Sequence, residues 1–288
     1  MKFLSLLLAV FLICLPLFGC APAGETAQIA ATTGFVYTFT THLCQGTDLT
    51  VTQLVTENVS CLHDYSLSVR QVRAAEAAEV VILSGGGLED FMADLLTGKN
   101  TIDCSRGISL QESCHDHDHS DHHHEADPHF WLSPASAKIM AENICIGLSA
   151  QYPALASQFA ENLISLCAKL DKLQQYGETE LASLKNRELI TFHDGFSYFA
   201  EGFGLTILKA VEEESGSEAS AAELKELITL AESHQISAIF TETNGSASAA
   251  QIISRETGIP IYTLNMAMTG DYFTAMYHNI DTIKEALG

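Results

Sequence analysis

Residues 188–210, ELITFHDGFSYFAEGFGLTILKA, carry the pattern that decides the fold. Two short apolar runs, ELITF (188–192) and LTILKA (205–210), have the composition of buried strands and are joined by a longer segment. Further strands are expected at 236–241 and 260–264, with helices between them. Because parallel strands need long crossover connections, usually helical, this alternation predicts an α/β lobe with a small parallel sheet.

The first half of the chain shows the same alternation. Strands are expected at 34–39, 49–55 and 79–84, and a helix is expected at 66–78. A second helix should follow the triple glycine that begins at Gly85. The first half therefore predicts another α/β lobe.

A long segment without strand signal separates the two halves. One helix is expected over PASAKIMAENICIGLSAQY. After Pro153, apolar residues at steps of three and four predict a second helix of roughly thirty residues and about 45 Å. We expect Gly177 to be its weakest point. The prediction is an α/β fold of two lobes, each with a small parallel sheet flanked by helices, joined by a long rigid helix. Its expected parts are an N-terminal lobe (34–151), the linking helix (152–186) and a C-terminal lobe (187–288).

The N-terminus has the features of an export signal. Lys2 precedes an apolar run, and residues 1–19 are too short and too proline-broken for a comfortable membrane span. The letters LFGC at the end of this run resemble a bacterial lipobox, which makes Cys20 the expected lipid attachment site. Cleavage after Ala21 or Ala23 is the alternative. With a lipid on Cys20, residues 20–33 are expected to form a short tether, and the chain is expected to be extracytoplasmic and anchored to the membrane by that lipid.

Charge and cysteine content narrow the classes of partner. The chain has 14 basic and 36 acidic residues, a net charge of −22, which disfavours nucleic acid and raises the local concentration of cations. No CxxC motif is present, so a cysteine-based zinc finger is not expected. Beyond the signal an even number of cysteines remains, compatible with disulfides of undetermined pairing: Cys44, Cys61, Cys104, Cys114, Cys145 and Cys167.

Four possible metal ligands follow strands or precede helices: His63, His129, His193 and Asp271. Ligands of parallel sheets bind outside the carboxyl ends of strands, so these distant residues can converge between the lobes. Three imidazoles and a carboxylate form a good tetrahedral set for Zn²⁺, whereas an oxygen-rich site would suit Mn²⁺ better. Taken singly, the histidines could be ordinary loop residues and Asp271 could be a helix N-cap.

The combination LHDYSLS, LSGGGLEDFM, DPHFWLSP, TFHDGFSYFAEGFGL, ISAIFTE and GDYFTAMYHNIDTIKEAL resembles the zinc/manganese solute-binding proteins of bacterial ABC transporters. The resemblance runs in order from about residue 34 to the end. It implies two lobes joined by a long helix, with one metal held by His63, His129, His193 and Asp271. Manganese-type members have a glutamate where His193 stands, so the chain resembles the zinc type. In some zinc-type members water or another acid completes the site, and the segment after 34–39 is shorter than the helix usual there.

Residues 114–126 resemble the histidine-rich loop of many zinc-type members. Alternating histidine and aspartate makes this tract too polar to pack, yet each neutral imidazole can chelate metal weakly. The loop is expected to collect or sense metal; the alternative is a solvated linker without a role. Its auxiliary ligands are His115, His117, His119, His122, His123 and His124.

These observations predict a monomeric receptor that binds Zn²⁺ and hands it to a membrane ABC permease, and they do not favour an enzyme. The alternatives are a manganese- or iron-type receptor, a metal-dependent surface adhesin, a zinc hydrolase, or a metal store in the loop alone. A hydrolase is disfavoured because neither HExxH nor GxSxG occurs in the sequence.

Overall fold

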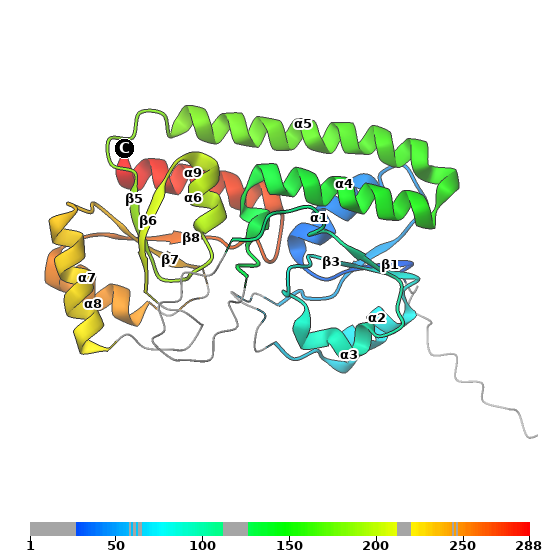
Figure 1. Ribbon diagram of the computed structural model, residues 1–288, viewed down its shortest axis with the longest axis horizontal. Coiled ribbons are helices and arrows are strands. Elements are labelled where there is room, and N and C mark those ends of the chain that lie inside the picture. The colour runs from blue at the N-terminus through cyan, green and yellow to red at the C-terminus, as the bar shows by residue number, and fades with distance from the viewer. Residues whose placement is uncertain are drawn as a thin grey trace, which may run out of the picture.

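The computed structural model describes residues 27–57, 59, 62, 65–111, 126–211, 220–243, 245 and 247–288. Two lobes, each with a four-stranded parallel sheet, lie side by side (Figure 1). The first sheet has the strand order β2-β1-β3-β4, and the second has the matching order β6-β5-β7-β8. The expected two-lobe α/β fold is confirmed.

The first sheet is built from four short strands, and its helices flank it. Ser68 begins α2 with a capping box, in which its hydroxyl accepts from the Gln71 N–H and the Gln71 side chain accepts from the Ser68 N–H. The elements are β1 (Ile29–Ala31), α1 (Gly34–Leu43), β2 (Val51–Gln53), α2 (Val69–Ala77), β3 (Val80–Leu83), the 3₁₀ helix η1 (Asp90–Met92), α3 (Ala93–Leu96) and β4 (Thr101–Asp103).

The start of this lobe differs from the expectation. The strand predicted at 34–39 is wrong, because these residues form α1, and the tether predicted to reach residue 33 instead contains the buried strand β1. The aromatic, β-branched run GFVYTF favours a strand by composition, yet Phe35, Phe39 and Leu43 recur at helical spacing and are fully buried. With α1 in place, the apparent shortening of the first helix disappears. Strand β4 was not predicted.

The second lobe follows its predicted order closely. Its four strands lie within a few residues of the expected ranges, and the helices between them begin with Ser220 as a capping-box residue for α7 and Asp271 as N-cap of α9. The elements are β5 (Glu188–Thr191), α6 (Ser197–Phe203), β6 (Thr206–Ala210), α7 (Ala221–Ser233), β7 (Ile239–Glu242), α8 (Ser248–Thr257), β8 (Ile261–Leu264) and α9 (Tyr272–Leu287).

The lobes are connected by η2 (Phe130–Leu132), α4 (Pro134–Gln151), η3 (Pro153–Leu155) and α5 (Ala156–Glu180). Helix α5 crosses both lobes, packing on α1 and α4 at one end and on α6 and α9 at the other (Figure 1). Its 25 residues span about 37 Å, shorter than expected because η3 precedes it and it ends at Glu180. Gly177 does not break this helix. It lies buried where a Cβ would come within 2.2 Å of the Phe203 ring.

The largest hydrophobic cluster of the described residues runs through both lobes and the connecting helices, and each lobe has a smaller cluster of its own. Trp131 lies at the centre of the largest cluster, fully buried and stacked on Phe35 at 4.3 Å between ring centroids. Its indole N–H donates to the Met266 carbonyl at 2.7 Å, and the Tyr272 hydroxyl donates to the Trp131 carbonyl at 2.8 Å. These contacts fix the segment before α4 against the second lobe. None of the helices in the described part of the chain is long and apolar enough to cross a bilayer.

Candidate metal centre

His129 is held in place by the residue two positions before it. The Asp127 Oδ1 atom accepts from the His129 backbone N–H at 2.9 Å and contacts its Nδ1 at 2.8 Å. Both side chains are buried, with 3% exposure each. Because a carboxylate can only accept, the imidazole carries its proton on Nδ1, and its Nε2 presents a lone pair.

The Tyr198 hydroxyl supports this segment from the second lobe. It donates to the Asp127 carbonyl at 3.0 Å and accepts from the Gln111 N–H at 2.7 Å. The ends of the chain segment that carries the histidine-rich tract are therefore fixed by one tyrosine of α6. This residue was not singled out from the sequence, where it is one aromatic among several in α6.

His193 follows β5, one of the two central strands of the second sheet. It is 4% exposed, and its Nδ1 lies 3.9 Å from Oε1 of Glu242, the buried last residue of the neighbouring strand β7. Gly195 packs directly on the ring, because a Cβ at that position would lie 2.7 Å from His193 Cδ2. The imidazole is thus confined between a glycine and a carboxylate at the carboxyl end of the sheet.

The two imidazoles meet through their Nε2 atoms. These atoms are 3.3 Å apart, and the rings are perpendicular with centroids 5.1 Å apart. Two nitrogens bound at 2.0–2.1 Å to one tetrahedral zinc ion would lie about 3.3–3.4 Å apart. The pair therefore has the spacing of two ligands of one metal, and the carboxylates behind the Nδ1 atoms correspond to the usual outer partners of zinc-bound histidines.

The other expected ligands do not join this pair in the described residues. His63 and the six loop histidines, as well as Cys20, lie outside the described residues. Asp271 is exposed and caps α9, with Oδ1 accepting from Thr274 N at 2.8 Å and Thr274 Oγ1 at 2.7 Å. Within the described ranges no group of three or more His, Cys, Asp or Glu side chains is placed to hold a metal. The full four-ligand set stays a prediction.

Some polar residues near the lobes' meeting point contact the histidine pair, and others lie elsewhere. Asp127, which in the sequence looks like a turn residue before Pro128, orients His129. Glu242 faces His193, whereas Tyr65 donates to Glu57 at 2.6 Å in the first lobe. His42 packs on α5 with its Nδ1 3.4 Å from Lys169 Nζ.

The described cysteines are free thiols: Cys44, Cys104, Cys145 and Cys167. Burial raises the pKa of the Cys44 thiol to about 12, which keeps it protonated and unreactive. Cys61 and Cys114 lie outside the described residues, so the pairing of the full set stays open.

The fold and the histidine pair together define a class, that of two-lobed binding proteins with a ligand site at the meeting point of the lobes. Residues 29–286 match the family described as "ZnuA: Zinc-uptake complex component A periplasmic", and the chain belongs to this family.

Relatives and solved structures agree with this assignment. The chain is 30% identical to zinc-binding lipoprotein AdcA of Streptococcus pneumoniae (strain ATCC BAA-255 / R6), over 99% of this chain and 61% of AdcA. It thus spans about three fifths of that relative. A crystal structure of ZnuA superimposes with a TM-score of 0.82 at 28% identity, covering 92% of this chain and all of ZnuA, and a zinc-bound ZnuA deletion mutant gives 0.80 at 28% identity, covering 91% and 98%. The laminin-binding protein Lmb of Streptococcus agalactiae, at 21% identity with a TM-score of 0.80 over 91% of this chain and all of Lmb, shows the fold alone.

Proposed function

We propose that this chain is an extracytoplasmic receptor that binds Zn²⁺ and delivers it to an ABC importer. The observation that carries the proposal is the buried pair of Nε2 atoms 3.3 Å apart, on histidines from the two lobes, each with a carboxylate behind its Nδ1. An imidazole pair selects zinc over the harder Mn²⁺ and Mg²⁺ ions. The family membership and the zinc named for its relatives support the same cargo.

His129 and His193 bind the ion from opposite lobes, and His63 supplies the third imidazole. Asp127 and Glu242 orient the rings and increase their basicity. Asp271 is the proposed fourth ligand. To bind, its carboxylate must give up the two bonds to Thr274, so water is the alternative. Since His129 and His193 are almost fully buried, an ion bound between them is shielded from solvent on their side.

The remaining parts of the proposal concern delivery. A lipid on Cys20 anchors the receptor outside the cytoplasmic membrane, and the loop at 114–126 collects zinc through its histidines. The partner is the membrane permease of an ABC importer, and the receptor acts as a monomer. AdcA, named a zinc-binding lipoprotein, supports both the anchor and the cargo.

Competitive titration of the mature chain with Zn²⁺, Mn²⁺ and Fe²⁺, read by native mass spectrometry, tests the proposal. We expect one tightly bound zinc, lost in His129→Ala and in His193→Ala and retained in His278→Ala, which changes an exposed histidine of α9. Equal zinc binding by the two site variants and the control would refute it.

Asp271→Asn separates the receptor from a zinc hydrolase. Asparagine is as good an N-cap as aspartate, so the fold is preserved while the negative ligand is lost. A receptor that uses Asp271 loses affinity, whereas a hydrolase that uses it as a base keeps zinc and loses turnover. Unchanged affinity with no hydrolytic activity would limit Asp271 to its capping role.

A further inference from the structure

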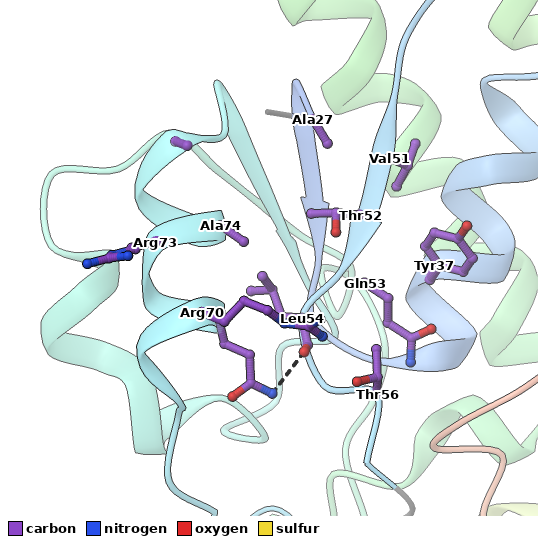
Figure 2. Close-up of a pocket in the computed structure, with 12 residues that line it drawn as sticks. Ala27, Tyr37, Val51, Thr52, Gln53, Leu54, Thr56, Arg70, Arg73 and Ala74 are labelled. Atoms are coloured by element: carbon purple, nitrogen blue, oxygen red, sulfur yellow. Dashed lines mark hydrogen bonds between the residues drawn. The ribbon is translucent and has the colours of Figure 1, made fainter. Parts of the chain in front are cut away.

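A groove on the first lobe lies away from the histidine pair. It has a volume of about 760 Å³ and lies between α2 and the edge strand β2 (Figure 2). Figure 2 shows Val51 and Thr52 of the strand on one side and Arg70, Arg73 and Ala74 of the helix on the other. Many of the side chains that line it are small or apolar, so the groove has room for a polar headgroup and a short apolar stem.

The charge of this groove is opposite to that of the chain. Arg70 and Arg73 are the charged residues among its described lining, in a protein with 36 acidic and 14 basic residues. Within the described part of the chain neither guanidinium has a hydrogen bond or ion pair. Glu57, which follows β2, is hydrogen-bonded by Tyr65 at 2.6 Å and by Gln71 at 2.9 Å. The arginines are therefore available for an anion, and guanidinium groups bind phosphate in a two-pronged geometry.

The chain also enters the lobe at this groove, because Ala27 is part of its lining. Between Cys20 and Ala27 there are seven peptide steps, which reach at most about 25 Å when fully extended. An acyl chain on Cys20 thus holds this groove close to the bilayer surface.

We propose that this groove faces the membrane and that Arg70 and Arg73 bind the phosphates of anionic phospholipid headgroups. The inference rests on the lipid attachment at Cys20 that belongs to the proposed function. The remainder of the strongly acidic surface is repelled by anionic lipid, so a tethered molecule turns this face inward. Val69, 68% exposed at the start of α2, adds an apolar contact beside Arg70.

The test uses the mature chain, acylated on Cys20, on vesicles of phosphatidylcholine with phosphatidylglycerol, a fraction of the latter carrying a photoreactive headgroup. Cross-linked peptides are identified by mass spectrometry. We expect cross-links in peptides from β2 and α2. Each arginine contributes about fivefold in affinity for such a surface, so Arg70→Ala/Arg73→Ala should lower the yield by roughly twenty-five-fold. The matched control, Lys225→Ala/Arg255→Ala, removes two exposed charges from the second lobe and should leave the yield unchanged.

Cross-links spread evenly over the surface, equal losses in both double variants, or the absence of an acyl group on Cys20 would each overturn the inference. So would cross-links between two copies of the chain through this groove. Zinc titration of the same variants keeps the two proposals distinct. Failure of zinc binding with groove cross-links intact would refute the receptor alone, and normal zinc binding without groove cross-links would refute the membrane-facing surface alone.

Discussion

Replacing Asp127 by asparagine tests how the histidine pair is built. The Asp127 Oδ1 atom serves both the backbone N–H and the Nδ1 of His129, at 2.9 and 2.8 Å. Asparagine preserves size and one acceptor but removes the charge. A hydrogen bond to a charged acceptor contributes about 1.5–3 kcal/mol, against about 0.5–1.5 kcal/mol for a neutral pair. The loss of about 1–2 kcal/mol predicts a zinc Kd raised by roughly 5- to 30-fold.

A chromophoric chelator competing for zinc at neutral pH measures this change. The matched control is Asp171→Asn, which removes a carboxylate that pairs with Lys138 at 2.7 Å and is 62% exposed. Glu242→Gln should have a smaller effect than Asp127→Asn, because its Oε1 lies 3.9 Å from His193 Nδ1. Wild-type affinity in folded Asp127→Asn, or an equal loss in the control, would refute the role assigned to the carboxylate.

Three further predictions follow from packing, burial and the loop. Gly177→Ala places a Cβ 2.2 Å from the Phe203 ring and should lower the free energy of unfolding by about 1–3 kcal/mol, while Gly202→Ala in α6, with its nearest neighbour at 3.7 Å, should leave it unchanged or raise it in the same urea titration. Burial raises the pKa of Glu89 from 4.5 to about 7. The folded state then holds a proton that the unfolded state releases, so stability should fall as pH rises from about 4.5 to 7 and level off above. Comparing wild type with Glu89→Gln at pH 5 and pH 8 isolates this component; an identical pH dependence would contradict it. Deleting 115–124 should leave one zinc per chain by native mass spectrometry, and complete loss would place the binding in the loop.

The second lobe could be predicted well because its strands are continuous apolar runs bounded by polar segments. The first lobe was harder at its start. Strand β1 consists of Ile29, Ala30 and Ala31, too few and too small to stand out in an alanine-rich stretch. The neighbouring run at 34–39 has strand-like composition, and tertiary packing makes it helical by burying Phe35 and Phe39. A short central strand such as β1 forms because it pairs with the strands on either side, β2 and β3, and its own three residues do not indicate it.

In the candidate site, too, some residues could be predicted from the sequence, whereas their contacts depend on the fold. His129 and His193 could be named because each follows a predicted strand or precedes a predicted helix. Although 64 positions separate them, the carboxyl-end rule for parallel sheets allowed them to meet, and the family resemblance implied it. Asp127 was visible two residues before His129, yet a turn residue and a hydrogen-bond partner look alike in a sequence. Distances such as that between Glu242 and His193 depend on strand pairing, which Ile190 and Ile239 provide as neighbours in β5 and β7.

The matching strand orders explain why the histidine pair is placed asymmetrically. In each sheet the order reverses between two strands, β1 and β3 in the first and β5 and β7 in the second, and ligands of such sheets bind at that point. In the first sheet the buried Glu89 fills it, accepting from Thr32 Oγ1 at 2.6 Å, Ser84 N at 2.7 Å and Gly85 N at 3.0 Å. In the second sheet His193 and Glu242 stand there instead. In the first sheet the Glu89 carboxyl group thus occupies the point where the strand order reverses. His129 of the first lobe lies instead beside His193 of the second lobe, so one ion bound to both histidines would join the two lobes.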